Sequence, residues 1–183
     1  MPIYPPLKLT LLNGFVLILP MIALRYGIPP LMKKEALAEL DYFPPTVGLE
    51  SLALKGYFVS NTFLIISPLL AQIKPLPGVS LPGWFIYVAG MIILTFSLID
   101  FCRQEGIKTA GVYRYSRNPM CVGYFFVFLG ASLLISSWFH LTLTAIYQLT
   151  VHWLILSEER WCLEHFSESY QEYYANVSRY FII

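Results

Sequence analysis

Charge is the property that this sequence has least of. Only 13% of its 183 residues are Asp, Glu, Lys or Arg, whereas about 25% is usual in a soluble domain. Hydrophobic residues make up 57% of the chain, and the mean hydropathy is +0.61. The net charge is +1, and without a Lys/Arg-rich tract nucleic acid is not an expected partner. The composition therefore predicts an integral membrane protein, in which lipid surrounds the apolar surface.

Cysteine is also scarce, and its spacing excludes two classes of site. Cys102, Cys121 and Cys162 are scattered and form no CxxC pair. This argues against a disulfide framework and against a thiolate metal site, so we expect reduced thiols and no metal. The N-terminal residues lack the basic start and the cleavage site of a signal peptide, so we expect the first apolar run to be a retained helix.

Long apolar runs without strict alternation predict transmembrane α-helices, because lipid offers no hydrogen-bond partner to an open backbone. The predicted spans are residues 9–28, 57–73, 82–102, 119–138 and 141–157. Residues 29–55 are more polar and are expected to hold a short surface helix. Residues 158–183 have apolar side chains at helical spacing and predict an amphipathic helix. The predicted fold class is all-α: one polytopic helical membrane domain over residues 1–183, with about five transmembrane helices plus the amphipathic helix.

The distribution of basic residues predicts an orientation. Five spans place ten Lys and Arg residues on one side of the membrane, and only Lys8 and Lys74 on the other. Because basic residues concentrate on the cytosolic side, the N-terminus is expected outside and the C-terminus in the cytosol. The bias also supports the number of spans, since removing one internal span would mix the two sets.

Polar groups concentrate at the start of the fourth predicted span. Asn118 is expected to be the N-cap of this helix, and Pro119 suits its first position. A helix N-terminus beside Arg117 is a suitable site for an anionic group such as a carboxylate or a phosphate. The alternative is that Asn118 and Pro119 only start a helix, while Arg114 and Arg117 anchor the protein at the membrane face.

Two acidic residues, Glu158 and Glu159, are predicted to end the fifth span at the same membrane face. A carboxylate at a helix C-terminus opposes the helix dipole, which favours a ligand such as ribose hydroxyls or a cation. The alternative is a solvated helix end in which Arg160 pairs with the acids. Further back along the span, His152 shares a polar face with Glu159, and it is a candidate base or an interhelical hydrogen-bond partner. Asp100 and Arg103 at the end of the third span are expected to pair.

These motifs resemble the isoprenylcysteine carboxyl methyltransferase family, whose wider group includes the membrane phospholipid methyltransferases. The resemblance covers roughly residues 82–181 and leaves residues 1–81 unmatched, so that 82–183 form the cofactor-binding half. The residues that carry it are Gly111-x-Tyr113-Arg114-x-Ser116-Arg117-Asn118-Pro119-Met120, then Glu158-Glu159-Arg160, and then Phe166, Tyr170, Tyr173 and Arg179-Tyr180.

The resemblance implies an S-adenosylmethionine-dependent methyltransferase with a cofactor pocket facing the cytosol. Its acceptor would be a lipophilic small molecule or a lipid that enters from the bilayer. The implied cofactor-binding residues are Gly111, Tyr113, Arg117, Asn118, Pro119, Glu158 and Glu159. The candidate catalytic or substrate-side residues are Arg114, His152 and Glu159.

Two positions depart from the pattern of the family. Asn118 stands where the family has histidine, and Cys121 stands where an aromatic residue is common. Asparagine donates hydrogen bonds but transfers no proton, so the change affects acid–base chemistry more than cofactor binding. The alternatives to a methyltransferase are a membrane NAD(P)H-dependent reductase of related architecture and a non-enzymatic lipid-binding membrane protein.

Overall fold

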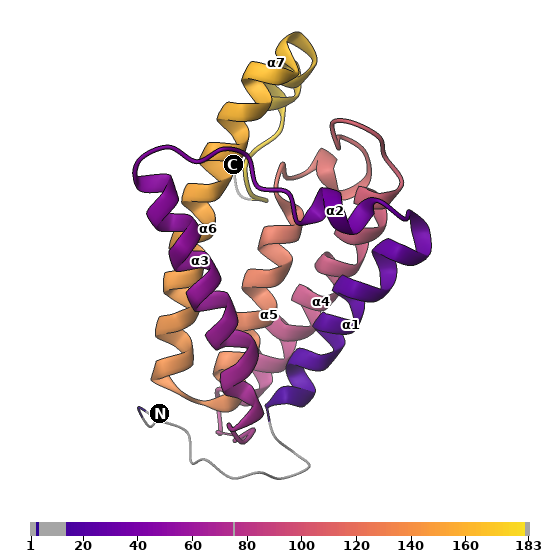
Figure 1. The fold of residues 1–183 in the computed structure, drawn as a ribbon. Coiled ribbons are helices and arrows are strands. Elements are labelled where there is room, and N and C mark those ends of the chain that lie inside the picture. The colour runs from indigo at the N-terminus through magenta and orange to yellow at the C-terminus, as the bar shows by residue number, and fades with distance from the viewer. Residues whose placement is uncertain (1–2, 4–13, 75, 182–183) are drawn as a thin grey trace.

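In the computed structural model the chain is a bundle of helices (Figure 1), described over residue 3 and residues 14–74 and 76–181. This part of the chain contains no β-strand, so the predicted all-α class is confirmed. The elements in chain order are α1 (Phe15–Met32), α2 (Ala36–Leu40), α3 (Leu49–Ile66), the 3-10 turn η1 (Ser67–Leu69), α4 (Ser80–Cys102), the 3-10 turn η2 (Gly111–Arg114), α5 (Pro119–Ile135), α6 (Trp138–His165) and α7 (Ser167–Asn176).

Five of these helices, α1, α3, α4, α5 and α6, run between the two ends of the bundle (Figure 1). Within the described ranges, α1, α3 with η1, α4 and α6 are long and apolar enough to cross a membrane. The fifth helix, α5, is apolar but has only 17 residues, which at about 1.5 Å per residue spans less than the ~30 Å hydrocarbon core. The protein is thus an integral membrane bundle, and each predicted span overlaps one of these helices.

Two helix boundaries differ from the prediction because charged side chains find partners. Helix α3 begins at Leu49 rather than at residue 57, since Glu50 accepts the Val47 N–H at 2.8 Å and pairs with Arg160 on α6. Helix α6 does not end at residue 157 but continues to His165, and the amphipathic helix α7 follows it. Residues 9–13 of the first predicted span lie outside the described residues.

Close helix packing organises one side of the bundle around α4 and α5. A Cβ atom at Gly90 would lie 2.6 Å from the Val127 backbone N, and one at Gly130 would lie 2.6 Å from the Tyr87 backbone N. Such small-residue contacts are typical of membrane helices, whose association depends on close van der Waals packing. Helix α3 lies against α6 on the other side, and α1 lies against α4. In Figure 1, α1 and α3 diverge toward the end of the bundle where α2 lies.

Helix α7 also lies at this end of the bundle (Figure 1). Most of the basic residues belong to the segments that meet here. The opposite end has Lys74, and Lys8 lies outside the described residues. The two ends therefore differ in charge as the sequence predicts. Which side of the membrane each end faces stays a prediction.

Candidate functional site

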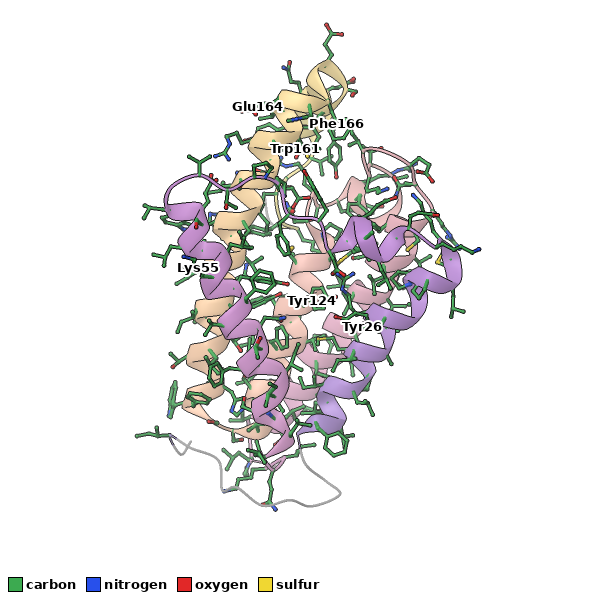
Figure 2. The ribbon with its side chains drawn as sticks, in the orientation of Figure 1. Tyr26, Lys55, Tyr124, Trp161, Glu164 and Phe166 are labelled. Carbon is green, nitrogen blue, oxygen red and sulfur yellow. The ribbon has the colours of Figure 1, made fainter. Side chains whose placement is uncertain are left out.

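A cavity of about 650 Å³ opens at the charged end of the bundle. This volume lies within the range of about 300–1,000 Å³ that is usual for small-molecule sites. Its inner wall is apolar and includes Met21 and Ile22 of α1, Ile65 of α3 and Val151 of α6. Figure 2 shows Tyr124 of α5 in the space between α3 and α1. Polar side chains line the rest of the cavity, and several of them come from the segments that the sequence analysis selected.

Glu159 lies at the centre of a buried ionic triad beside this cavity. Only 4% of its surface is exposed. Its Oε1 accepts a hydrogen bond from Nε of Arg117 at 3.0 Å and lies 2.9 Å from Nη2 of the same guanidinium in an ion pair. Its Oε2 accepts from Nε and Nη2 of Arg179 at 3.0 and 2.8 Å. The carboxylate raises the pKa of Arg179 further above its usual value. The triad explains why α6 continues through this position, since two guanidinium groups neutralise the buried carboxylate.

The triad also fastens the C-terminal segment to the start of α5. Arg117 donates from Nη1 to the carbonyl oxygens of Tyr174, at 2.9 Å, and of Val177, and its backbone N–H donates to Ser178 O at 2.9 Å. Ser116 Oγ donates to Arg179 O at 3.1 Å. Hydrogen bonds between neighbouring backbone and side-chain groups thus join α7 and its exit to η2 and α5. Arg117 and Glu159 therefore hold these elements in place at the cavity wall.

The start of α5 is where the sequence predicts it, but its capping differs. Pro119 is the first helical residue, whereas the Asn118 side chain makes no cap hydrogen bond and instead donates to Arg179 O at 3.4 Å. Asn118 is thus the N-cap residue as predicted, but its side chain does not cap the helix, because the C-terminal segment supplies a competing acceptor. The first turn of α5 keeps free N–H groups at Met120 and Cys121, and both residues line the cavity.

Glu158 is the free carboxylate of the site. Its side chain is exposed and lines the cavity, and within the described part of the chain it has neither a hydrogen bond nor an ion pair. It does not pair with Arg160, which binds Glu50 instead. Glu158 and Glu159 lie inside α6 rather than at its end, so the helix-dipole argument for them does not apply. What distinguishes the two is their surroundings: Glu159 is neutralised by arginines, and Glu158 faces the cavity.

Three buried tyrosines surround the mouth of the cavity beside Glu158: Tyr113 of η2 and Tyr170 and Tyr173 of α7. The Tyr173 hydroxyl donates to Tyr113 O at 2.7 Å and ties α7 to η2. Burial raises the pKa of the Tyr113 phenol well above its usual value and the pKa of Tyr173 to about 12. These phenols therefore stay neutral at physiological pH.

Gly111 shapes the turn that carries Tyr113 rather than lining the cavity. Its φ is +64°, and a Cβ atom there would lie 2.0 Å from Asp100 Oδ2. Asp100 Oδ2 accepts the Val112 N–H at 2.9 Å. No ion pair joins Asp100 to Arg103 in the ranges that the structure describes, so the pairing expected from their spacing is wrong. The carboxylate is used to fix η2.

Two of the predicted substrate-side residues lie apart from the cavity lining. Arg114 is exposed at the end of η2. His152 lies on α6, and its Nδ1 is 2.8 Å from the Tyr180 hydroxyl. The structure thus brings Tyr113, Arg117, Asn118, Pro119, Glu158 and Glu159 to one cavity wall, and leaves Gly111, Arg114 and His152 outside it.

Sequence reasoning missed Arg25 and Asp41, which line the other side of the cavity. Arg25 Nη2 donates to Asp41 Oδ1 at 2.5 Å. A signal for Arg25 was present, because it is the one charged residue in the apolar run 9–28. Ionisable residues inside apolar spans usually face a cavity or a partner. Asp41 carried no such signal, because it lies in a polar connection.

Comparison with known proteins gives one family. The phospholipid methyltransferase family model matches residues 83–169, which include η2, α5, α6 and most of α4. The comparisons with curated proteins and with solved structures found no match. The match does not single out the isoprenylcysteine carboxyl methyltransferase branch. It confirms the resemblance at the level of the wider group of membrane methyltransferases, since residues 83–169 match the phospholipid methyltransferase family model.

Proposed function

We propose that the protein is a methyltransferase that uses S-adenosylmethionine to methylate a lipophilic acceptor entering from the bilayer. The observation that carries the proposal is a single cavity with two kinds of wall. One polar wall, with Tyr113, Asn118 and Glu158, comes from the segment that matches the methyltransferase family model, and the apolar inner wall comes from membrane helices. A water-borne cofactor and a lipid-borne acceptor would meet in such a cavity.

The polar wall fits the chemistry of the cofactor. S-adenosylmethionine has an amino-acid end, with an ammonium and a carboxylate, and a ribose with two hydroxyls. The free Glu158 carboxylate would accept hydrogen bonds from the ribose or from the ammonium. The free N–H groups at Met120 and Cys121 would receive the carboxylate, as helix N-termini commonly do. Tyr113, Asn118 and Pro119 would complete the contacts. When bound, the cofactor supplies an electrophilic methyl group on a sulfonium.

The other predicted residues would act on the geometry of the site. Arg117 and Glu159 hold the start of α5 against α6, and Gly111 fixes η2 through Asp100. Catalysis would come mainly from orienting the two reactants and excluding water. A carboxylate or thiolate acceptor needs no base, whereas an amine has to lose a proton. Arg114 and His152 stay substrate-side predictions, and of the two only the imidazole of His152 can accept a proton.

We further propose that the charged end faces the cytosol, with the N-terminus outside and the C-terminus in the cytosol. The excess of basic residues at this end supports that orientation. Modification of a single cysteine at position 34 or 74 by an impermeant reagent in sealed cells would test it. Labelling at 34 and not at 74 would contradict the proposal.

Calorimetry on protein purified in nanodiscs tests the cofactor assignment. We expect S-adenosylmethionine to bind the wild type, and Glu158→Gln to weaken binding about tenfold, as for the loss of a charged hydrogen-bond acceptor. The matched control is Glu164→Gln, since Glu164 is exposed on the same helix and does not line the cavity. Absence of binding to the wild type, or equal binding by the two variants, would contradict the assignment.

Methyl transfer itself needs a second assay. Labelled S-adenosylmethionine incubated with the protein and a total lipid extract should give a labelled, solvent-extractable product. A thermal shift with NADPH and none with S-adenosylmethionine would favour a reductase instead. Lipid binding without either cofactor would favour a non-enzymatic protein. The family match supports neither alternative.

A further inference from the structure

We propose that Arg25 and Tyr124 form a binding site for an anionic oxygen of the acceptor, such as a phosphate or carboxylate oxygen on an amphiphile. The inference deepens the proposed function, because it names a chemical group that the acceptor carries. It concerns the side of the cavity built by α1, which lies outside the family-matched segment.

The first observation is an unused donor on Arg25. Its side chain is 15% exposed and lines the cavity. Nη2 binds Asp41, but Nη1 is buried and has no hydrogen-bond partner. An arginine side chain has five N–H donors and accepts nothing, so a partner for Nη1 has to be an acceptor. Buried polar groups are rarely left unpaired, so an acceptor from a bound molecule is the expected partner.

The second observation is another unused hydroxyl in the same cavity. The Tyr124 hydroxyl on α5 is buried and also lacks a hydrogen-bond partner. Tyr124 lies in the space between α3 and α1 (Figure 2). Tyr57 of α3 lines the cavity as well. One guanidinium and two phenols from three helices thus line the same cavity.

The positive charge of Arg25 favours an anionic acceptor oxygen, because charge-assisted hydrogen bonds are the stronger ones. Asp41 is 62% exposed at its side chain, so its charge is largely hydrated and neutralises Arg25 only in part. Of the other charged groups that line this side, Glu39 and Lys108 pair with each other, and Glu39 also pairs with Lys33. Each charged group on this side therefore has an ion-pair partner, but the cationic Arg25 keeps a buried N–H donor at Nη1 that has no acceptor. On the α6 side, Glu158 has no ion pair in the part of the chain that the structure describes.

The position of Arg25 favours the acceptor, rather than the cofactor, as the molecule that carries this oxygen. Arg25 lies about two turns before the end of α1 at Met32, near the level where the polar headgroups of lipids begin. Next to it, the cavity is bounded by the apolar residues of α1 and α3. An amphiphile with its chain along this wall would bring an anionic headgroup to Arg25. Cys121 in the first turn of α5 lines the same cavity as Arg25 and Glu158.

Three probes with the same chain length test the site: dodecyl phosphate, dodecanoate and dodecanol. Binding is measured as thermal stabilisation in phosphate-free dodecyl maltoside micelles. We expect one or both anionic probes to bind the wild type about tenfold more tightly than the alcohol. Arg25→Met should abolish this preference, and Tyr124→Phe should reduce it. Arg103→Met is the matched control, because Arg103 is exposed at the same end and does not line the cavity.

A variant of opposite sign covers the case in which Arg25→Met does not fold. Asp41→Asn removes the competing carboxylate and should tighten the binding of the anionic probes. Equal binding of anionic and neutral probes, or a preference that survives Arg25→Met, would overturn the site. Equal stabilisation by inorganic phosphate alone would overturn its assignment to an amphiphile. Probe selectivity without S-adenosylmethionine binding would refute the proposed function but support the anion site.

Discussion

Replacing Glu159 with glutamine gives the sharpest test of the architecture around the cavity. The substitution keeps the size of the side chain but removes the negative charge that two arginines share. Arg117 is 8% exposed and Arg179 is 27% exposed at the side chain, so water compensates only part of the loss. Removing one partner of a buried ion pair costs about 3–5 kcal/mol. Because Arg179 reaches water, we expect the lower value, about 3 kcal/mol.

The assay is thermal unfolding of the purified protein in micelles. For a chain of this length, 1 kcal/mol corresponds to about 2–4 °C, so Glu159→Gln should lower Tm by about 6–12 °C. Glu164→Gln on the same helix is exposed and should change stability by less than about 0.5 kcal/mol. The result that refutes the reasoning is a Tm of Glu159→Gln within about 2 °C of the Glu164→Gln value. The triad would then contribute little to stability, and the continuation of α6 would need another cause.

Two further predictions concern the turn at η2 and the connection between α1 and α3. Gly111→Ala should destabilise the protein by about 1–2 kcal/mol because of the positive φ, and by a further amount because the new Cβ would clash with Asp100. The control is Gly106→Ala, at φ +62° with open space around it, which should show the cost of the positive φ alone. Equal Tm values for the two variants would contradict the clash. The Lys33 ammonium lowers the pKa of Glu39 by a hydrogen bond, so this pair contributes stability above the usual carboxyl pKa that is lost as pH falls through the lowered value. For an exposed pair this contribution to the free energy of unfolding is below about 1 kcal/mol. When unfolding is measured from pH 7 to pH 3, the corresponding part of the pH dependence should be absent in Glu39→Gln. A pH dependence equal to that of the wild type would contradict the prediction.

The sequence predicts the parts of the fold that depend on local pattern. Apolar runs locate the five long helices, and Pro119 marks the start of α5 because its fixed φ suits a first helical position. The amphipathic C-terminal helix is also confirmed, although it begins at Ser167 instead of at residue 158.

The sequence-based predictions fail where a residue far away in the sequence pairs with a charged or polar side chain and lowers the energetic cost of burying it. Glu158 and Glu159 look like the end of a span, since charges are costly in lipid. Arg117 and Arg179, which neutralise Glu159, lie 42 and 20 residues away in the sequence. Asn118 is the N-cap residue of α5 as predicted, but its side chain donates to Arg179 O instead of capping the helix. Such contacts exist only once the chain has folded, so local patterns do not contain them.

The hydrogen bonds between Arg117 and the C-terminal segment 174–179 also determine when the site can form during biosynthesis. All five long helices precede these residues, so the ribosome completes them first. While the helices enter the membrane, Arg117 and Glu159 lack Arg179 and the carbonyl groups that later surround them. The wall of the cavity is therefore completed after insertion, once residues 174–179 have left the ribosome. A nascent chain held before that point should contain the spanning helices but no finished site.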